Sequence, residues 1–149
     1  MTIKEMRAEI DKVMEAVVDV AEKTGYNDFE YLDCIYNEED PNEIQELHEL
    51  QVFLDDVITA TERILYLREP ITHEGILRYT PRGKLSIITG NEEEIELDGG
   101  QWIEILQYDF INKRDEWRLT RTSRATAGNY SIVGNGIAIG EMTQARIRY

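Results

Sequence analysis

The chain has 149 residues, of which 42% are hydrophobic, and its formal net charge at pH 7 is −14. This composition excludes wholesale disorder, and the apolar runs are too short for a membrane-spanning helix. The single cysteine, Cys34, excludes an internal disulfide, and the two histidines, His48 and His73, are too few for a histidine-based metal centre. Residues 1–12 lack the apolar core of a signal peptide, so we expect a cytoplasmic protein.

The negative charge is concentrated in the first half of the chain. Residues 1–70 contain 19 acidic and 6 basic side chains, whereas residues 71–149 contain 11 and 10. Between Asp28 and Asp56 there are 11 acidic residues and no lysine or arginine. This asymmetry predicts two parts with different surfaces, an acidic region at 1–70 and a second domain at 72–149.

The first segment shows the stripe of an amphipathic helix that ends at Thr24 and Gly25. Its apolar residues are separated by alternating steps of three and four, which places them on one face. Because this period is close to 3.5 residues, the stripe could also be a dimer seam. The stripe consists of Ile3, Met6, Ile10, Val13, Val17 and Val20.

A second long helix is predicted to begin at Asp40-Pro41, where the aspartate can cap the helix and the proline suits its first position, and to end before Pro70. Asn27 to Tyr36 is predicted to form a short helix between the two long ones. We expect the long helices to pack as an antiparallel hairpin with the short helix alongside. The second stripe consists of Ile44, Leu47, Leu50, Leu54, Val57, Thr61, Ile64 and Leu65.

From Thr72 onward the hydrophobic period changes to two, which is typical of strands. Glycine-rich turns separate the alternating segments, and Asn135-Gly136 is a hairpin signal. We therefore predict a small antiparallel SH3-like β-barrel at 72–149, and an α+β protein as a whole. The expected strands are 75–80, 84–89, 94–97, 102–108, 116–122, 129–133, 137–139 and 145–149.

Aromatic and glycine markers recur through this second half. They are Gly75, Leu77, Tyr79, Gly83, Trp102, Ile103, Glu104, Trp117, Arg121, Tyr130, Arg146 and Ile147. With them, residues 75–148 resemble a small β-domain of unknown function from proteins of Gram-positive mobile elements. The resemblance implies a phage or mobile-element setting and no defined activity.

The sequence offers little for catalysis, and we expect no enzyme activity, no cofactor and no metal. Acidic neighbours would raise the pKa of Cys34 and so disfavour a reactive thiolate. His48 lacks the second histidine of a helical zinc motif, and His73 lies beside Glu74 at a helix-to-strand junction. The glycines at 99–100 and 134–136 suit hairpin turns. They are not phosphate-binding loops, because neither pair precedes a helix that carries a phosphate-binding lysine.

The acidic residues suggest a binding function. On a helix, carboxylates three and four positions apart lie close together, so Glu39, Glu43, Glu46 and Glu49 would form a row of negative charge. Such a row could occupy the basic groove of a host nucleic-acid-binding defence enzyme, such as an RNA-guided or restriction nuclease, and inhibit it. It could equally serve solubility alone, or a general protein–protein adaptor. The candidate partner-binding residues are Asp28, Glu30, Asp33, Glu38, Glu39, Asp40, Glu43, Glu46 and Glu49.

The arginines of the second half support a different hypothesis, a regulatory protein that binds nucleic acid directly. On a regular strand Arg118 and Arg124 share one face, and Arg146 and Arg148 share another. If the two faces adjoin, the four guanidinium groups form a basic patch that can hold phosphate. Arg121, on the other face of its strand, is also a candidate nucleic-acid-binding residue. The other interpretation is that these arginines pair with the protein's own acids. The sequence also leaves open a homodimer, formed either through the first helix or through an edge strand of the sheet.

Overall fold

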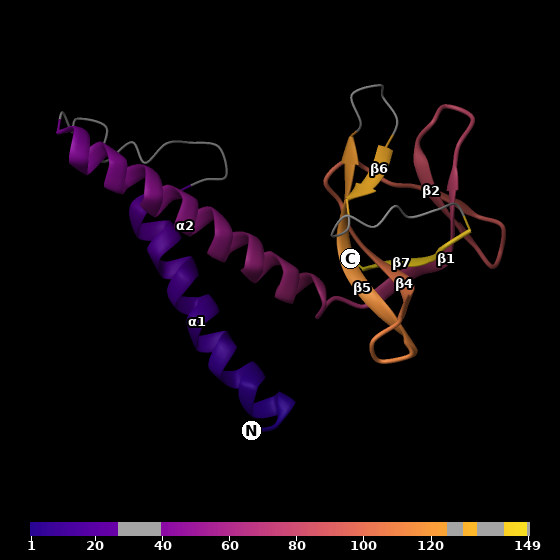
Figure 1. Ribbon diagram of the computed structural model, residues 1–149, viewed down its shortest axis with the longest axis horizontal. Helices are drawn as coiled ribbons and strands as arrows, with labels where there is room; N and C mark the ends of the chain where they lie inside the picture. The colour runs from indigo at the N-terminus through magenta and orange to yellow at the C-terminus, as the bar shows by residue number, and fades with distance from the viewer. Residues whose placement is uncertain (27–39, 125–129, 134–141, 149) are drawn as a thin grey trace. The chain divides into compact units, whose positions relative to one another are not determined.

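A computed structural model describes residues 1–26, 40–124, 130–133 and 142–148, with two helices followed by seven strands (Figure 1). The α+β class predicted from the sequence is therefore confirmed. The chain divides into two compact units, Met1–Ile64 and Leu65–Tyr149, which are described separately below. The short helix predicted at 27–36 lies outside the described residues, so the structure describes two helices where three were expected.

Helix α1 spans Ile3–Thr24 and is capped at both ends by its own sequence. The Thr2 hydroxyl accepts a hydrogen bond from the Glu5 backbone N–H at 3.2 Å, and the Glu5 carboxylate accepts one from the Thr2 N–H at 2.7 Å. This capping box satisfies two of the N–H groups that a helix start leaves unpaired. At the other end Gly25 takes a left-handed conformation with φ of 66°, which confirms the predicted stop.

Helix α2 spans Pro41–Tyr66 and begins as predicted. Asp40 Oδ1 accepts a hydrogen bond from the Asn42 backbone N–H at 2.8 Å, and Pro41 occupies the first helical position. The helix ends four residues before Pro70, at Tyr66, and turn hydrogen bonds such as Arg68 N–H to the Leu65 carbonyl follow it.

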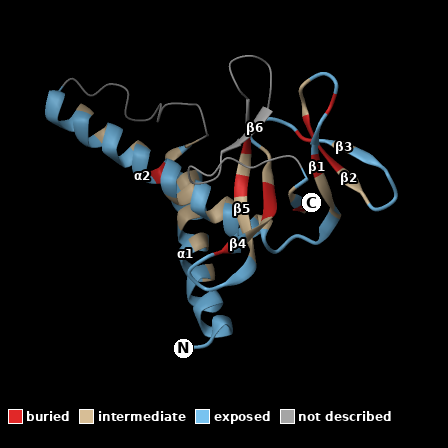
Figure 2. Ribbon diagram, turned by 45° about the vertical axis from the view of Figure 1, so that its right-hand side comes forward, coloured by how far each residue is buried: buried red, intermediate tan, exposed pale blue. Residues whose placement is uncertain are grey.

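The helical unit buries little of its apolar surface (Figure 2). No residue of α1 is buried, and Leu54 is the one buried residue of α2. The Tyr26 hydroxyl donates a hydrogen bond to the Asp55 carboxylate and so ties the end of α1 to the middle of α2. The hairpin is thus formed, but several members of both apolar stripes remain exposed to solvent. These are Ile3, Met6, Ile10, Val13, Val20, Leu50, Ile64 and Leu65.

The second unit is one seven-stranded antiparallel sheet with the order β3-β2-β1-β7-β4-β5-β6. The last described strand, β7, inserts between β1 and β4. The strands are β1 Ile71–Tyr79, β2 Leu85–Thr89, β3 Glu94–Glu96, β4 Trp102–Asp109, β5 Arg114–Arg124, β6 Tyr130–Val133 and β7 Gln144–Arg148.

The prediction of a closed SH3-like barrel is wrong. Closure requires the two edge strands to pair, and in the described residues β3 and β6 each bond to one neighbour only. Both edges are short, with three residues in β3 and four in β6, which limits the ladder they could offer each other. The last described strand, β7, lies in the middle of the sheet and so does not join its two edges.

The core of this unit follows from strand alternation. Ile103 and Ile105 of β4 face the core together with Ala145 and Ile147 of β7, and all four are essentially inaccessible to solvent. Glu104, between the two isoleucines, must point to the opposite face of the sheet. The remaining core residues are Leu77, Leu85, Ile87 and Leu97, with Ile95 packed against them.

Candidate functional site

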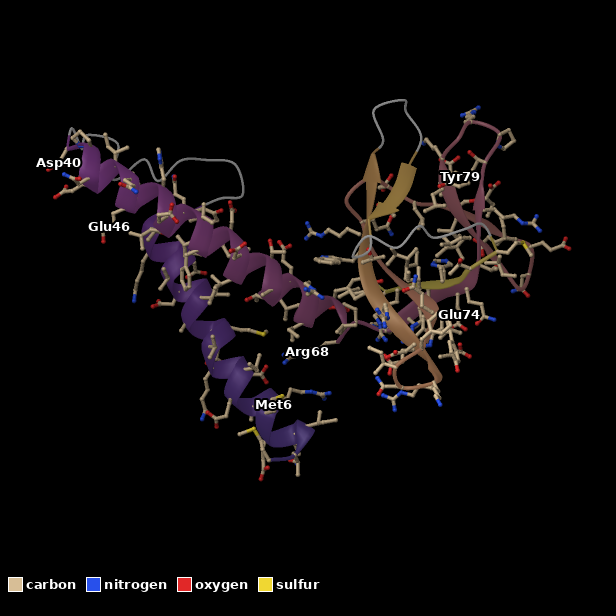
Figure 3. All side chains as sticks on the ribbon, in the orientation of Figure 1. Met6, Asp40, Glu46, Arg68, Glu74 and Tyr79 are labelled. Carbon is tan, nitrogen blue, oxygen red and sulfur yellow. The ribbon has the colours of Figure 1, made fainter. Side chains whose placement is uncertain are left out.

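The acidic row predicted on the second helix is partly described, and that part is exposed. Asp40, Glu43, Glu46 and Glu49 all expose their side chains at the beginning of α2. Figure 3 labels Asp40 and Glu46 there, with their oxygen atoms at the surface of the helix. The other five predicted binding residues lie outside the described residues, and they are Asp28, Glu30, Asp33, Glu38 and Glu39.

The carboxylates of this row differ in what they contact. Asp40 is engaged in capping, since its Oδ1 also lies 3.1 Å from Asn42 Nδ2. Glu46 and Glu49 have neither a hydrogen bond nor an ion pair to any residue that the structure describes. They also lie beyond the first turn of α2. At that distance the partial positive charge of the helix N-terminus offsets less of a carboxylate's negative charge than it does within the first turn. Their charge is therefore available to an external cation.

Two carboxylates of helix α1 form ion pairs with lysines of the same helix. Glu9 forms an ion pair with Lys12 at 2.8 Å, and Asp19 forms one with Lys23 at 2.5 Å. By contrast, α2 contains no lysine or arginine before Arg63. The negative field of the helical unit is accordingly least compensated along the first part of α2.

The predicted basic residues build a separate cluster around one buried carboxylate of the sheet. Glu104 is 3% exposed and pairs in register with Arg146 of β7. Arg146 Nη2 lies 2.9 Å from Glu104 Oε1, and Arg148 Nε lies 2.7 Å from Glu104 Oε2. One carboxylate thus binds two guanidinium groups, each with most of its side chain buried.

The arginines of this cluster also contact aromatic rings and main-chain carbonyls. The Arg146 guanidinium lies 4.0 Å from the ring centre of Trp117, and the Arg121 guanidinium lies 4.0 Å from that of Trp102. Arg148 Nη1 donates hydrogen bonds to the carbonyls of Leu67 and Glu69 at 3.2 and 2.9 Å. Arg146 and Arg148 are therefore committed to contacts within the sheet unit.

The electrostatics agree with this geometry. Burial alone would raise the pKa of the Glu104 carboxyl, but hydrogen bonds and charge from Arg148 and Arg146 outweigh it, so its pKa lies below the ordinary value of 4.5. The hydrogen bond to Glu104 raises the pKa of Arg148 above its ordinary value. All three groups are charged at neutral pH, and the Glu104 carboxylate offsets one of the two guanidinium charges that it contacts.

The strand register separates the remaining arginines from this cluster. Arg118 pairs with Ile105, whereas Arg146 pairs with Glu104, so Arg118 lies on the opposite face of the sheet from Arg146. Its guanidinium lies 3.9 Å from Asp109 Oδ2. Arg124 is the last residue of β5. The predicted basic patch therefore does not form on one face.

Sequence reasoning missed Glu104 as the centre of the arginine cluster. The signal was present, since Glu104 stands between the apolar residues Ile103 and Ile105, and Arg146 and Arg148 have the spacing of one strand face. Cys34 lies outside the described residues. The ring Nδ1 of His73 lies 3.2 Å from the Thr72 hydroxyl, and within the described ranges His, Cys, Asp and Glu form no group suited to a metal ion.

Comparison with family models, curated proteins and solved structures found no match to the chain. Neither described helix is both long enough and apolar enough to cross a membrane.

Proposed function

We propose that this protein is a non-catalytic acidic binding protein of a phage or mobile element. Its acidic helical face would occupy the basic nucleic-acid groove of a host defence enzyme, such as an RNA-guided or restriction nuclease, and inhibit it. The mobile-element setting rests on the sequence resemblance of residues 75–148. The mode of binding rests on the carboxylates of α2.

The observation that supports the proposal best is the contrast between the two charged regions. Glu46 and Glu49 are exposed and have no ion pair to a described residue, whereas Arg146 and Arg148 already bind Glu104. Surplus negative charge is thus presented outward, and two arginines of the sheet are engaged internally. A protein with this balance attracts a cationic surface at long range and associates quickly at low salt.

Direct nucleic-acid binding through the sheet has less support. It would use Arg118, Arg121, Arg124, Arg146 and Arg148, but the register divides Arg118 from Arg146, and the whole chain repels a polyanion at a net charge of −14. A gel shift with single- and double-stranded probes separates the two functions. A shift abolished by Arg118→Ala together with Arg124→Ala would favour the sheet.

The proposed function is tested by competition at a nuclease. A panel of purified RNA-guided and restriction nucleases would be assayed for cleavage with and without the protein, at low and high salt. We expect inhibition of at least one nuclease, relieved by salt and by excess substrate nucleic acid, because both compete for the same groove.

The matched variants place the two charge changes on different helices. Glu46→Lys with Glu49→Lys should weaken inhibition by roughly tenfold or more, because both carboxylates would face the groove. Glu15→Lys with Glu22→Lys makes the same change in net charge on exposed positions of α1 and should have a much smaller effect. If both pairs of substitutions weaken inhibition equally, only a general effect of net charge remains. If the unmodified protein shows no salt-sensitive inhibition of any nuclease, the proposal is refuted.

A further inference from the structure

One side of α2 combines exposed apolar side chains with carboxylates. Phe53 is 60% exposed and Leu50 is 50% exposed, although both lie in the middle of a long helix. At 100° per residue, Phe53 lies well round the helix from the buried Leu54. Leu50, four residues before Leu54, lies at the edge of the buried side, so Phe53 and the outer part of Leu50 form an apolar area that is left to solvent.

The carboxylates surround this apolar area at helical spacing. Glu49 precedes Phe53 by four residues and Asp56 follows it by three, so both lie beside its ring. Glu46 stands four residues before Leu50. These five residues, Glu46, Glu49, Leu50, Phe53 and Asp56, are called the α2 strip below.

The charges of the α2 strip decide what can cover it. None of its three carboxylates has an ion pair to a described residue. A second copy of the strip would bring six carboxylates together in a partly desolvated contact, which is unfavourable. A cationic surface would instead neutralise them, while its apolar side chains cover Leu50 and Phe53.

We propose that the α2 strip binds a basic amphipathic helix of a partner protein. Apolar side chains of that helix contact Phe53 and Leu50, and lysines or arginines on its flanks contact Glu46, Glu49 and Asp56. This inference rests on the proposed function and deepens it, because it names the structure of the partner's basic surface. A phosphate groove lined only by charged side chains would leave Phe53 exposed.

The contact uses two kinds of interaction with different consequences. The carboxylates set the rate of association and its salt dependence, as charges at the edge of an interface do. The aromatic ring supplies the apolar anchor, the kind of residue that contributes most when it becomes fully desolvated. Removing Phe53 should therefore weaken binding at every salt concentration, whereas removing carboxylates should weaken it mainly at low salt.

The experiment uses the full chain and two synthetic peptides of leucine and lysine. The patterned peptide has leucines at helical spacing on one face, and the scrambled peptide has the same composition without that face. Fluorescence anisotropy measures the affinity of each peptide across a salt series. We expect the patterned peptide to bind about tenfold more tightly than the scrambled one.

Variants of the α2 strip separate the contribution of the Phe53 ring to binding from that of the carboxylates. Phe53→Ser should weaken binding of the patterned peptide by about tenfold or more. Val18→Ser is the matched control, since Val18 is 48% exposed and lies on α1, away from the α2 strip in the sequence. Glu49→Gln with Asp56→Asn should reduce the salt dependence, with Glu15→Gln and Glu22→Gln on α1 as the control pair. Circular dichroism establishes that each variant retains its helices.

Three different results would overturn the inference, and they distinguish its failure from failure of the proposed function. Equal binding of both peptides, unchanged by Phe53→Ser, would refute the apolar anchor while leaving the nuclease inhibition standing. Binding by neither peptide at low salt, with no inhibition in the nuclease assay, would refute both. A dimer that Phe53→Ser dissociates in sedimentation would identify a second copy as the occupant and would also refute the inference.

Discussion

Glu104 and Arg148 join distant parts of the sheet unit through an ion pair, with 2.7 Å between Oε2 and Nε. Arg146 binds the other carboxylate oxygen at 2.9 Å. Because the carboxylate is 3% exposed, its burial is tolerated only while both arginines remain in place. The pair thus joins β4 to the last described strand, which completes the middle of the sheet.

Glu104→Gln should destabilise the sheet unit by about 3–5 kcal/mol, because it leaves two largely buried guanidinium groups without their counter-ion. Both tryptophans of the chain, Trp102 and Trp117, belong to this unit, so their fluorescence in a urea titration reports its unfolding. Glu93→Gln, in the exposed turn before β3, is the control and should stay within about 0.5 kcal/mol. Equal effects of the two changes would contradict the role assigned to Glu104.

The same cluster predicts how stability changes with pH. The pKa of Glu104 is lowered in the folded protein, so its contribution is fully present above the ordinary value of 4.5 and is lost as the pH falls through the folded value. Asp109 acts in the same direction, since hydrogen bonds from the Asn112 side chain and the Ile111 and Asn112 N–H groups lower its pKa.

The measurement is the free energy of unfolding at a series of pH values from neutral to acid. We expect a plateau above the ordinary carboxyl range and a decline below it. The Glu104→Gln curve should decline less, so that the two curves converge in acid. Parallel curves would show that Glu104 has no part in the pH dependence.

A glycine in β1 is required by the close approach of the next strand. A Cβ atom at Gly75 would lie 2.0 Å from the backbone carbonyl oxygen of Ile88. Gly75→Ala should therefore force β1 and β2 apart and cost roughly 2–4 kcal/mol, measured by the same urea titration. Gly90→Ala is the control, because nothing lies within 4 Å of a Cβ at that position. A Gly75→Ala protein as stable as the control would refute the close packing.

Local signals allowed the helices to be predicted from sequence, because their ends depend on neighbouring residues. Gly25 ends α1 through its left-handed conformation, and Asp40 with Pro41 begins α2. The end of α2 is less sharply predicted: Pro70 requires the helix to end before it, and the helix ends at Tyr66, because a proline sets a limit and not the last helical residue.

Long-range pairings explain what the sequence did not predict. Alternation predicts that Ile103 and Ile105 share a face, but not which strand lies next to β4. The insertion of β7 between β1 and β4, and with it the contact of Glu104 with Arg148, joins residues more than forty positions apart. The internal use of Arg146 follows from that pairing, because it places Arg146 opposite Glu104.

The helical unit depends on few buried contacts, which makes Leu54 its most sensitive position. Leu54 is 6% exposed and is the one buried side chain of α2, so Leu54→Ala should destabilise the helices by about 2–3 kcal/mol. Leu50→Ala removes the same side chain from a 50% exposed position and should cost less than half as much, because little of it leaves water on folding. Circular dichroism at the helical minimum, followed with temperature, compares the two variants. If both lower the transition equally, the burial of Leu54 contributes no more to the stability of the helices than the half-exposed Leu50 does.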